Sequence, residues 1–568
     1  MISISDNAVA SSSADRSTAV ADDLLRRGER QKAFLAYRDV LAVHPDHPQA
    51  LLGTALILSL SGNHRQSYRF TRAALASAPD MPGAWHLLST LGVAMIDPRA
   101  VAQAAWRAVA IDSNFAAGHI NLGKALIALY ETNPDLPGVF ALHEKGLAAL
   151  DRALRLDPDC LGYSYMAALH AAAGNPETTR TLYDEHFRRT GLLTETVVPG
   201  GFRIIPREVT RAIGNLALID FYIKMLLLGW RPPHTVKAIA PPGKVANMHY
   251  LRCWRRYLIV IDDPKEIAEV EPHYRRGDCG IGGLVVQGRT RLFPEAAAAA
   301  QVQWEAERRP PLLDLDEEDA VRGEAVLREM GLGANDWFVG LHVRESGFHR
   351  DIGRNSPMVY RNASIDRFGP AIEAIAKRGG WVIRMGDPSM TPLGSHERVI
   401  DYAVGPRKSE WMDVFLCARG RFFLGSASGM HMVPATFGVP CAIANAAPMG
   451  SRPVFAADIF IPKLYWSKLE GRYLGFVEST APPLGHAAHA GLFETRGVEL
   501  VENTPEEIEG LVAEMLDRLD GSAGYSAEDE MLQARFRAET APFSAWGTNS
   551  RIGRDFLRFH AALLESRQ

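Results

Sequence analysis

Cysteine is scarce in this sequence, and the few cysteines present are far apart. Five occur in 568 residues, and no two of them have the C-x-x-C spacing. That spacing marks many zinc sites and redox dithiols, so neither is predicted here. A sparse, odd number of cysteines in a large chain is typical of a reducing compartment.

Long apolar runs are also missing. The most apolar stretch, residues 216–230, is interrupted by Asp220 and Lys224, and it is shorter than the roughly 20 apolar residues that span a bilayer. Residues 1–20 are polar and serine-rich and lack the apolar centre of a signal peptide. We therefore expect a cytoplasmic protein without a transmembrane segment, and peripheral attachment to the inner membrane stays open.

The chain has no excess of positive charge. It contains 62 Lys and Arg against 66 Asp and Glu, for a net charge of -4. A nucleic-acid-binding protein normally shows a basic domain or stripe, so nucleic acid is not expected as a partner. The sequence also has no P-loop, G-x-G-x-x-G, H-E-x-x-H or G-x-S-x-G motif, so the enzyme classes that depend on these motifs are not predicted.

A repeat is present in the first third of the chain. Pro45, Pro79 and Ser113 occur at intervals of 34 residues, and each precedes a small-residue helical run. A period of 34 residues is that of the tetratricopeptide repeat, a helix–turn–helix unit, and residues 16–192 resemble an array of such units. Residues 1–15 are expected to be disordered. The array either binds a partner or a second copy of the chain along its concave groove, or only supports the remainder of the protein.

After residue 192 the pattern changes to short apolar runs that alternate with helices, which predicts parallel α/β structure. A first lobe is expected at 193–328, a second at 329–500, and C-terminal helices at 501–568 that pack back across both lobes. The predicted strands are 202–205, 235–239 and 258–261 in the first lobe, and 338–343, 381–385, 399–402, 422–424 and 441–444 in the second. The first lobe also contains a predicted helix at 215–228, with Gly214 at its start where a ligand or another backbone can come close.

Polar side chains occur directly after the predicted strands of the second lobe. Ligands of open parallel sheets bind beyond the carboxyl ends of the strands. The candidates at this edge are His342, Arg344, Glu345, Arg384, Asp387, Ser426, Ser428, Gly429 and Asn445. Arginines also recur in the polar loop after the first of these strands, at Arg350, Arg354 and Arg361, and Ser364 is a candidate helix cap.

These residue types suit a diphosphate. A guanidinium presents a fixed fork of donors to phosphate oxygens, and the free N–H groups of the turn 426–429 can receive further oxygens. Fixed positive charge beside a departing nucleoside diphosphate lowers the barrier of sugar transfer selectively. Arg344 could instead close a strand end through an ion pair, Asp387 could shape a turn, and Asn445 could satisfy backbone groups.

Four segments in this order carry a resemblance: residues 340–344, 360–364, 382–387 and 423–429. They resemble a family of bacterial glycosyltransferases that often carry tetratricopeptide repeats. They are also similar to the α1,6-fucosyltransferase and protein O-fucosyltransferase group, and residues 461–463 extend the match. The resemblance implies a GT-B fold of two Rossmann-like lobes after the α-solenoid, and metal-independent, inverting transfer from a nucleotide sugar, with no cofactor.

By position, the resemblance implies that Arg344 and the turn 426–429 hold the donor diphosphate. Arg361 and Asn362 belong to the same predicted donor site, and Asp413 and Asp387 would contact the ribose or base or orient Arg344. Glu345 stands where the fucosyltransferases commonly have a second arginine, so GDP-fucose is not assumed as the donor. On the acceptor side, Asn215 stands where the bacterial family favours histidine.

Several interpretations stay open on the sequence alone. The general base could be Glu345 or His349, which come after the same strand, or a residue of the first lobe. The acceptor could be a protein such as flagellin or a surface glycan. A non-catalytic repeat scaffold with an inactive transferase region, and a sugar-nucleotide hydrolase or epimerase, are the alternative functions.

Overall fold

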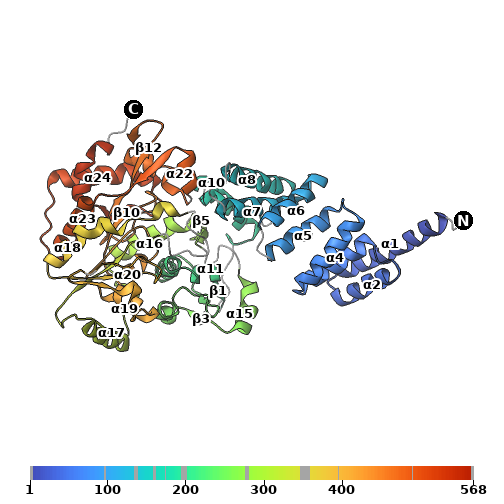
Figure 1. The fold of residues 1–568 in the computed structure, drawn as a ribbon, viewed down its shortest axis with the longest axis horizontal. Helices are drawn as coiled ribbons and strands as arrows, with labels where there is room; N and C mark the ends of the chain where they lie inside the picture. The colour runs from blue at the N-terminus through green and yellow to red at the C-terminus, as the bar shows by residue number, and fades with distance from the viewer. Residues whose placement is uncertain are drawn as a thin grey trace. The chain divides into compact units, whose positions relative to one another are not determined.

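The computed structural model describes residues 4–94, 98–132, 139–157, 162–172, 174–193, 201–274, 281–345, 358–394, 396–488 and 490–564 (Figure 1). The chain forms two compact units, Met1–Met166 and Ala167–Gln568. Among the described residues, no helix has both the length and the apolar character needed to cross a membrane.

The first unit is built from consecutive helices that pair in sequence order. They are α1 (Ile4–Arg26), α2 (Arg30–Val43), α3 (Pro48–Leu60), α4 (His64–Ser77), α5 (Pro82–Ala94), α6 (Pro98–Ile111), α7 (Ala116–Thr132) and α8 (Val139–Leu156). Helices α3, α5 and α7 begin 34 residues apart, as the repeat predicts. Proline begins α3, α5 and α6 because a first-turn residue needs no N–H partner. The unit is therefore a tetratricopeptide-type array.

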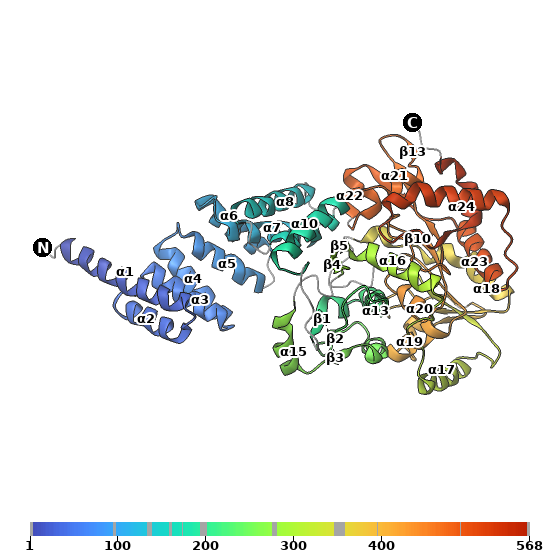
Figure 2. The same cartoon turned by 180° about the vertical axis from the view of Figure 1, so that it is seen from behind.

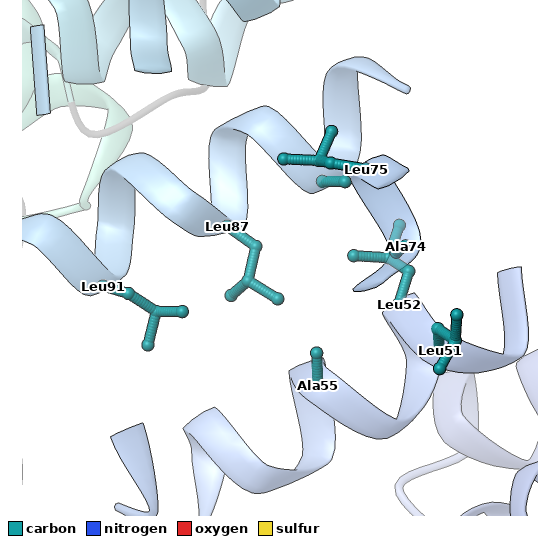
Figure 3. Close-up of a cluster of buried hydrophobic side chains, with 8 residues drawn as sticks. Leu51, Leu52, Ala55, Ala74, Leu75, Leu87 and Leu91 are labelled. Carbon is teal, nitrogen blue, oxygen red and sulfur yellow. The ribbon is translucent and has the colours of Figure 1, made fainter. Parts of the chain in front are cut away.

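Neighbouring repeats share one apolar core, which Figure 3 shows for α3, α4 and α5. The cluster consists of Leu51, Leu52, Ala55, Ala74, Leu75, Ala84, Leu87 and Leu91. Its residues come from two successive helical hairpins, because a single hairpin leaves its apolar face uncovered. Stacking of units thus stabilises the array.

The sequence predicted disorder over residues 1–15, and the structure describes a helix, α1, from Ile4 onward. Ala14 and Ala21 of this helix are buried against Tyr37 and Val40 of α2. The serine-rich composition concealed a face of small residues that packs well against a neighbouring helix.

The second unit begins within α9 (Gly162–Ala172) and includes α10 (Pro176–Arg189). Helix α10 packs on a hairpin of β4 (Gly283–Val286) and β5 (Arg289–Leu292). A Cβ on Gly283 would lie 2.4 Å from the ring of Tyr183, so glycine is required there. This packing places the division between the compact units before the predicted boundary at residue 192.

A three-stranded parallel sheet comes after α10, with the order β1 (Phe202–Ile205), β2 (Thr235–Ile239), β3 (Ile259–Ile261). These are the three strands predicted for the first lobe. The single helix predicted at 215–228 is instead two helices, α12 (Ile213–Ala217) and α13 (Ile219–Leu227). The other helices of this region are α11 (Arg207–Thr210), α14 (Met248–Cys253), α15 (Pro264–Val270), α16 (Phe293–Ala306) and α17 (Glu317–Glu329).

A seven-stranded sheet forms the centre of the second unit, and all of its pairs are parallel. Its order is β15 (Arg551–Ile552), β11 (Ile459–Pro462), β10 (Cys441–Ala446), β9 (Phe422–Gly425), β6 (Phe338–His342), β7 (Trp381–Arg384), β8 (Val399–Asp401). All five strands predicted for this region are present. The prediction of an α/β region with parallel sheets is therefore confirmed.

Helices connect and cover these strands. They are α18 (Gly369–Lys377), α19 (Glu410–Arg419), α20 (Met432–Thr436), α21 (Phe476–Thr480), α22 (Ala490–Thr495), α23 (Pro505–Leu519), α24 (Ala527–Thr540) and α25 (Arg554–Phe559). Figure 2 shows α18 beside α23, in agreement with their contacts. A small antiparallel sheet has the order β13 (Arg472–Tyr473), β12 (Leu464–Ser467), β14 (Val498–Val501).

The C-terminal segment contacts both α/β regions. Thr504 caps α23, and its hydroxyl accepts a hydrogen bond from the Glu507 N–H at 3.2 Å. Helix α23 packs on β10 and β11, and β15, which the sequence did not predict, extends the large sheet. The Trp546 ring lies 6.0 Å from that of Phe221 in α13. The segment is therefore part of the α/β fold rather than an appendage.

A buried carboxyl group joins the starts of β10 and β11. Asp458 is 1% exposed, and its Oδ1 accepts a hydrogen bond from the Cys441 N–H at 2.8 Å. Burial raises the pKa of Asp458 to about 8. The folded protein therefore keeps a proton on this group at pH values where the unfolded chain, with an ordinary aspartate pKa near 4, has lost it.

We predict that Asp458 makes the protein less stable as the pH rises from about 4 to about 8. Over that window the unfolded state binds fewer protons than the folded state. Replacement by Asp458→Asn, which keeps an oxygen acceptor for Cys441, should reduce the loss of unfolding free energy between pH 5 and pH 8 by on the order of 1 kcal/mol or more. Denaturant titrations of both proteins at the two pH values measure the difference. An unchanged pH dependence in the variant would contradict the prediction.

Candidate anion-binding site

The site lies at the carboxyl edge of the seven-stranded sheet, where β6 pairs with β9. His342 ends β6 and is in register with Gly425, the last residue of β9. The Ser426 N–H donates to the His342 carbonyl at 3.1 Å, and the Arg344 N–H donates to the Ser426 hydroxyl at 2.8 Å. The parallel register thus brings together Arg344 and the 426–429 turn, two elements that the sequence assigned to one site.

Two arginines of this edge are held by neutral groups only. The Arg344 guanidinium donates to the Met358 carbonyl at 2.9 Å and to the Asn362 side-chain oxygen. The Arg361 guanidinium donates to the Ala427 carbonyl at 3.0 Å. Within the part of the chain that the structure describes, neither arginine is paired with a carboxylate. Each guanidinium therefore carries positive charge that no carboxylate of the described residues compensates.

Lys463 adds a third cation directly after β11. Its ammonium group is buried and donates to the Asn362 carbonyl at 2.6 Å, while the nearest carboxylate oxygen, on Glu502, is 3.9 Å away. Burial is the main reason that the pKa of Lys463 falls to about 8, and the charge of Arg344 acts in the same direction. Asn362 thus links Arg344 and Lys463 through its side-chain and backbone oxygens.

Two neutral histidines lie near these cations. Burial, with the charge of Arg344 as the next cause, lowers the pKa of His342 to about 4. Burial and the charge of Arg361 lower the pKa of His431 to about 4 in the same way. Both Nδ1 atoms and the Ser428 hydroxyl are buried and lack a hydrogen-bond partner among the described residues. Buried polar atoms normally have partners, so the edge has both unmatched positive charge and unused hydrogen-bonding capacity.

Arg384, predicted to bind the donor, is placed differently. Its side chain is 0% exposed and is matched by two carboxylates, Glu345 at 2.6 Å and Asp401 at 3.3 Å. The second Glu345 oxygen accepts from the Thr391 N–H at 3.2 Å. Glu345 is therefore occupied with Arg384 rather than free to act as a base, and we assign both residues a positioning role behind the edge.

Three further candidates have structural partners of their own. The Asp387 carboxylate accepts from the Ser389 N–H at 2.9 Å and closes a turn. Asp413 is paired with Lys408, and burial raises its pKa. Asn445 has a φ of 55° and exchanges two hydrogen bonds with Asn503. No hydrogen bond connects these three side chains with Arg344 or Arg361 in the described residues.

Gly214 and Gly429 are in direct backbone contact. A Cβ on Gly429 would lie 2.8 Å from both the Cα and the N of Gly214, closer than real Cβ atoms approach. The close approach predicted at Gly214 is therefore made by the turn after β9, and it joins the two α/β regions beside the site. Asn215 is near this contact in sequence, and its side-chain amide donates to the Glu208 carbonyl at 3.3 Å.

The remaining candidate residues are not part of the site described above. His349, Arg350 and Arg354 lie outside the described residues. Ser364 does not cap a helix through its side chain, because a 3-10 turn at Ile365–Phe368 comes first and α18 begins only at Gly369. The described residues hold no group of three or more His, Cys, Asp and Glu suited to a metal ion.

His431 and Lys463 were not predicted as site residues from the sequence. Lys463 comes directly after the buried run Ile459–Pro462, so the same strand-end rule that identified Arg344 could have identified it. His431 comes two residues after Gly429 and gives no signal in a single sequence. Its place beside Arg361 depends on the tertiary fold.

Comparisons with known proteins concern the helical repeats. No family model matches the sequence, and no curated protein sequence does. Similar solved structures include MamA from Desulfovibrio magneticus RS-1 (16% identity, TM-score 0.25, 32% of this chain and 94% of that chain) and Pseudomonas aeruginosa PilF (15% identity, TM-score 0.29, 39% and 86%). YrrB, described as a tetratricopeptide-repeat protein with an unusual peptide-binding site, is 16% identical with a TM-score of 0.25, over 31% and 85%. These similarities cover the N-terminal part of the chain.

We predict opposite stability effects for two arginines of the same edge. Arg384→Met leaves Glu345 and Asp401 unpaired next to an apolar group and should lower the free energy of unfolding by about 3–5 kcal/mol. Arg344→Met leaves no carboxylate unpaired and should stay within about 1 kcal/mol of the wild type. Denaturant titration of the two variants makes the comparison. Equal losses would contradict the assignment of Arg384 to a structural role that Arg344 does not share.

Proposed function

We propose that the protein is a glycosyltransferase that binds the diphosphate of a nucleotide sugar at Arg344, Arg361 and Lys463 and transfers the sugar to an acceptor hydroxyl. The observation that supports this proposal is the uncompensated positive charge at the carboxyl edge of the large sheet. Isolated buried charge is unfavourable without a partner. A ligand with about two negative charges is the partner that this arrangement suits.

A diphosphate fits the distribution of donors. Arg344 and Arg361 approach the turn after β9 from opposite ends of the segment 344–361, and Lys463 is joined to Arg344 through Asn362. Guanidinium groups bind phosphate oxygens in pairs of hydrogen bonds. The Ser428 hydroxyl has no other partner among the described residues and is available to the same ligand.

The same charges would assist the chemistry. The leaving nucleoside diphosphate gains negative charge as the glycosidic bond to phosphate breaks, and fixed cations stabilise that charge more in the transition state than in the ground state. Arginine and lysine supply this stabilisation themselves, so the proposed reaction requires no metal. Direct displacement by the acceptor hydroxyl would invert the anomeric configuration.

His342 is the described residue that best suits the role of general base, because Glu345 is held by Arg384. Its Nδ1 has no partner within the described chain, and Arg344 contributes to its low pKa. Burial is the main cause of that low pKa, and a bound diphosphate would offset only the charge of Arg344, the second cause, and so shift the pKa of His342 upward. Donor binding would therefore make His342 a stronger base.

In this proposal the repeat array recruits the acceptor, a protein or a glycan. Concave surfaces of stacked helical repeats commonly bind extended partners. The array accounts for about a third of the chain, and the proposed chemistry needs none of it. Two other functions stay distinguishable by experiment: a nucleotide-binding screen separates an inactive scaffold from the transferase, and release of free sugar without an acceptor separates a sugar-nucleotide hydrolase.

We expect one nucleoside diphosphate to raise the thermal unfolding midpoint of the full-length protein, because a ligand that binds the folded state stabilises it. The screen consists of GDP, UDP, CDP, dTDP, ADP and CMP. Arg344→Met and Arg361→Met should each abolish the shift. At a ligand concentration one hundred times the dissociation constant, the stabilisation in the wild type is about 2.7 kcal/mol.

The matched control is Arg419→Met, an exposed arginine paired with Glu324 at 2.6 Å on the surface. It should keep the full shift. Absence of a shift with every nucleotide contradicts the proposal and favours the inactive scaffold. Release of free sugar at an undiminished rate without an acceptor favours the hydrolase.

A further inference from the structure

A buried arginine without a carboxylate partner also lies in the loop between β10 and β11. Arg452 is 3% exposed, and its Nε and both Nη atoms have no hydrogen-bond partner in the described chain. All of its N–H donors are therefore unused. Leaving a buried charged group without hydrogen bonds is strongly unfavourable.

The loop holds Arg452 firmly in place. The Gly450 N–H donates to the Gly485 carbonyl at 2.8 Å, and the Ser550 hydroxyl donates to the Pro453 carbonyl at 2.7 Å. The guanidinium carbon lies 4.9 Å from the ring centroid of Phe536 in α24 and 5.8 Å from that of Phe460 in β11. The two rings pack on the cation but offer its N–H groups no oxygen.

Further unmatched polar atoms occur on the same side of α24. Gln533 lies one turn before Phe536, is 2% exposed, and has no partner for either side-chain amide atom among the described residues. Arg537 comes directly after Phe536. One of its Nη atoms donates to the Asn549 carbonyl at 3.3 Å, but its Nε is buried without a partner in that part of the chain. Burial is the main cause that lowers the pKa of Arg452, and the charge of Arg537 acts in the same direction.

The neighbouring Arg551 differs from Arg452 and Arg537 because it is paired with carboxylates. Arg551 lies 2.9 Å from Glu530 and 3.7 Å from Glu514. Neither Arg452 nor Arg537 has a carboxylate within ion-pair distance in the described residues. Arg452 packs on Phe536, and Gln533 and Arg537 lie within one turn of Phe536 in α24, so two guanidinium groups and one amide of this region have no matching anion among the described residues.

We propose that Arg452, Gln533 and Arg537 form a buried site for one small inorganic anion, separate from the site at Arg344. Arginine N–H groups and the Gln533 amide supply donors, and the aromatic rings exclude water. The anion joins the β10–β11 loop to α24 and so stabilises the packing of the C-terminal segment on the large sheet. Chloride and a single phosphate or sulfate share this chemistry, and the experiment distinguishes them.

The test measures the thermal unfolding midpoint of the full-length protein in sodium gluconate at constant ionic strength. Gluconate is replaced stepwise by chloride, phosphate or sulfate. We expect the midpoint to rise by about 2–4 °C with the anion that binds. A response to chloride alone identifies a halide site, and a response to phosphate or sulfate at lower concentration identifies an oxyanion site.

Arg452→Met supplies the decisive comparison. In gluconate the variant should be at least as stable as the wild type, because it lacks the buried unmatched charge. In the binding anion the wild type should be the more stable of the two. Gln533→Met, which removes one donor and keeps the volume, should shift the response to higher anion concentration and gives a second reading if Arg452→Met does not fold.

The same titrations are repeated with the double variant Arg344→Met, Arg361→Met, which removes the proposed donor site. The anion response should persist in it. A response that vanishes in this background but remains in Arg452→Met would assign the anion to the donor site and overturn the proposal. No response to any of the anions would overturn it as well, since ordered water would then be the partner of Arg452.

Discussion

The parallel pairing of β6 with β7 on one side and β9 on the other is the constraint on which the proposed site depends. It aligns three strand ends at one edge of the seven-stranded sheet. The first residues after each strand then meet, and the hydrogen bond from the Arg344 N–H to the Ser426 hydroxyl fixes two of the segments together. The contact of Gly214 with Gly429 adds the other α/β region to the same place.

The arginines of this edge divide into two kinds according to their partners. Arg384 is paired with Glu345 and Asp401 and stabilises the sheet edge. Removal of the arginine or of the carboxylates would leave an unpaired buried charge. Among the described residues, Arg344 and Arg361 have neutral partners only, an arrangement that stabilises the folded chain less and suits a ligand that supplies the negative charge. Loss of stability at a functional site is a common compromise in proteins. Arg452, which is distant from Arg344 in sequence, likewise has no carboxylate partner among the described residues.

Periodicity in the sequence predicted most of the secondary structure that positions the site, although it did not predict β11, which precedes Lys463. The 34-residue period marked the repeat helices, and short apolar runs marked all eight of the predicted strands. The residues directly after each strand also brought Arg344 and Ser426 to one edge. These inferences succeed because they depend on local patterns and on one general property of parallel sheets.

The features that the sequence could not predict depend on contacts between distant residues. The pairing of Arg384 with Glu345 spans 39 positions, and that of Asn445 with Asn503 spans 58. Both pairings give candidate ligand-binding residues partners within the chain. The packing of α1 and the place of His431 beside Arg361 likewise result from tertiary structure. A single sequence contains the charges but does not show which of them neutralise one another.

The most direct test of the central claim compares the binding of a nucleoside with that of its diphosphate by titration calorimetry. The claim is that Arg344, Arg361 and Lys463 together bind a diphosphate, because the described residues offer these three cations only one carboxylate, that of Glu502 at 3.9 Å from Lys463. It predicts that the diphosphate binds at least about tenfold more tightly than the nucleoside with the same base, since each charge-assisted hydrogen bond contributes about 1.5–3 kcal/mol. Equal affinities, or no binding of either, would contradict it.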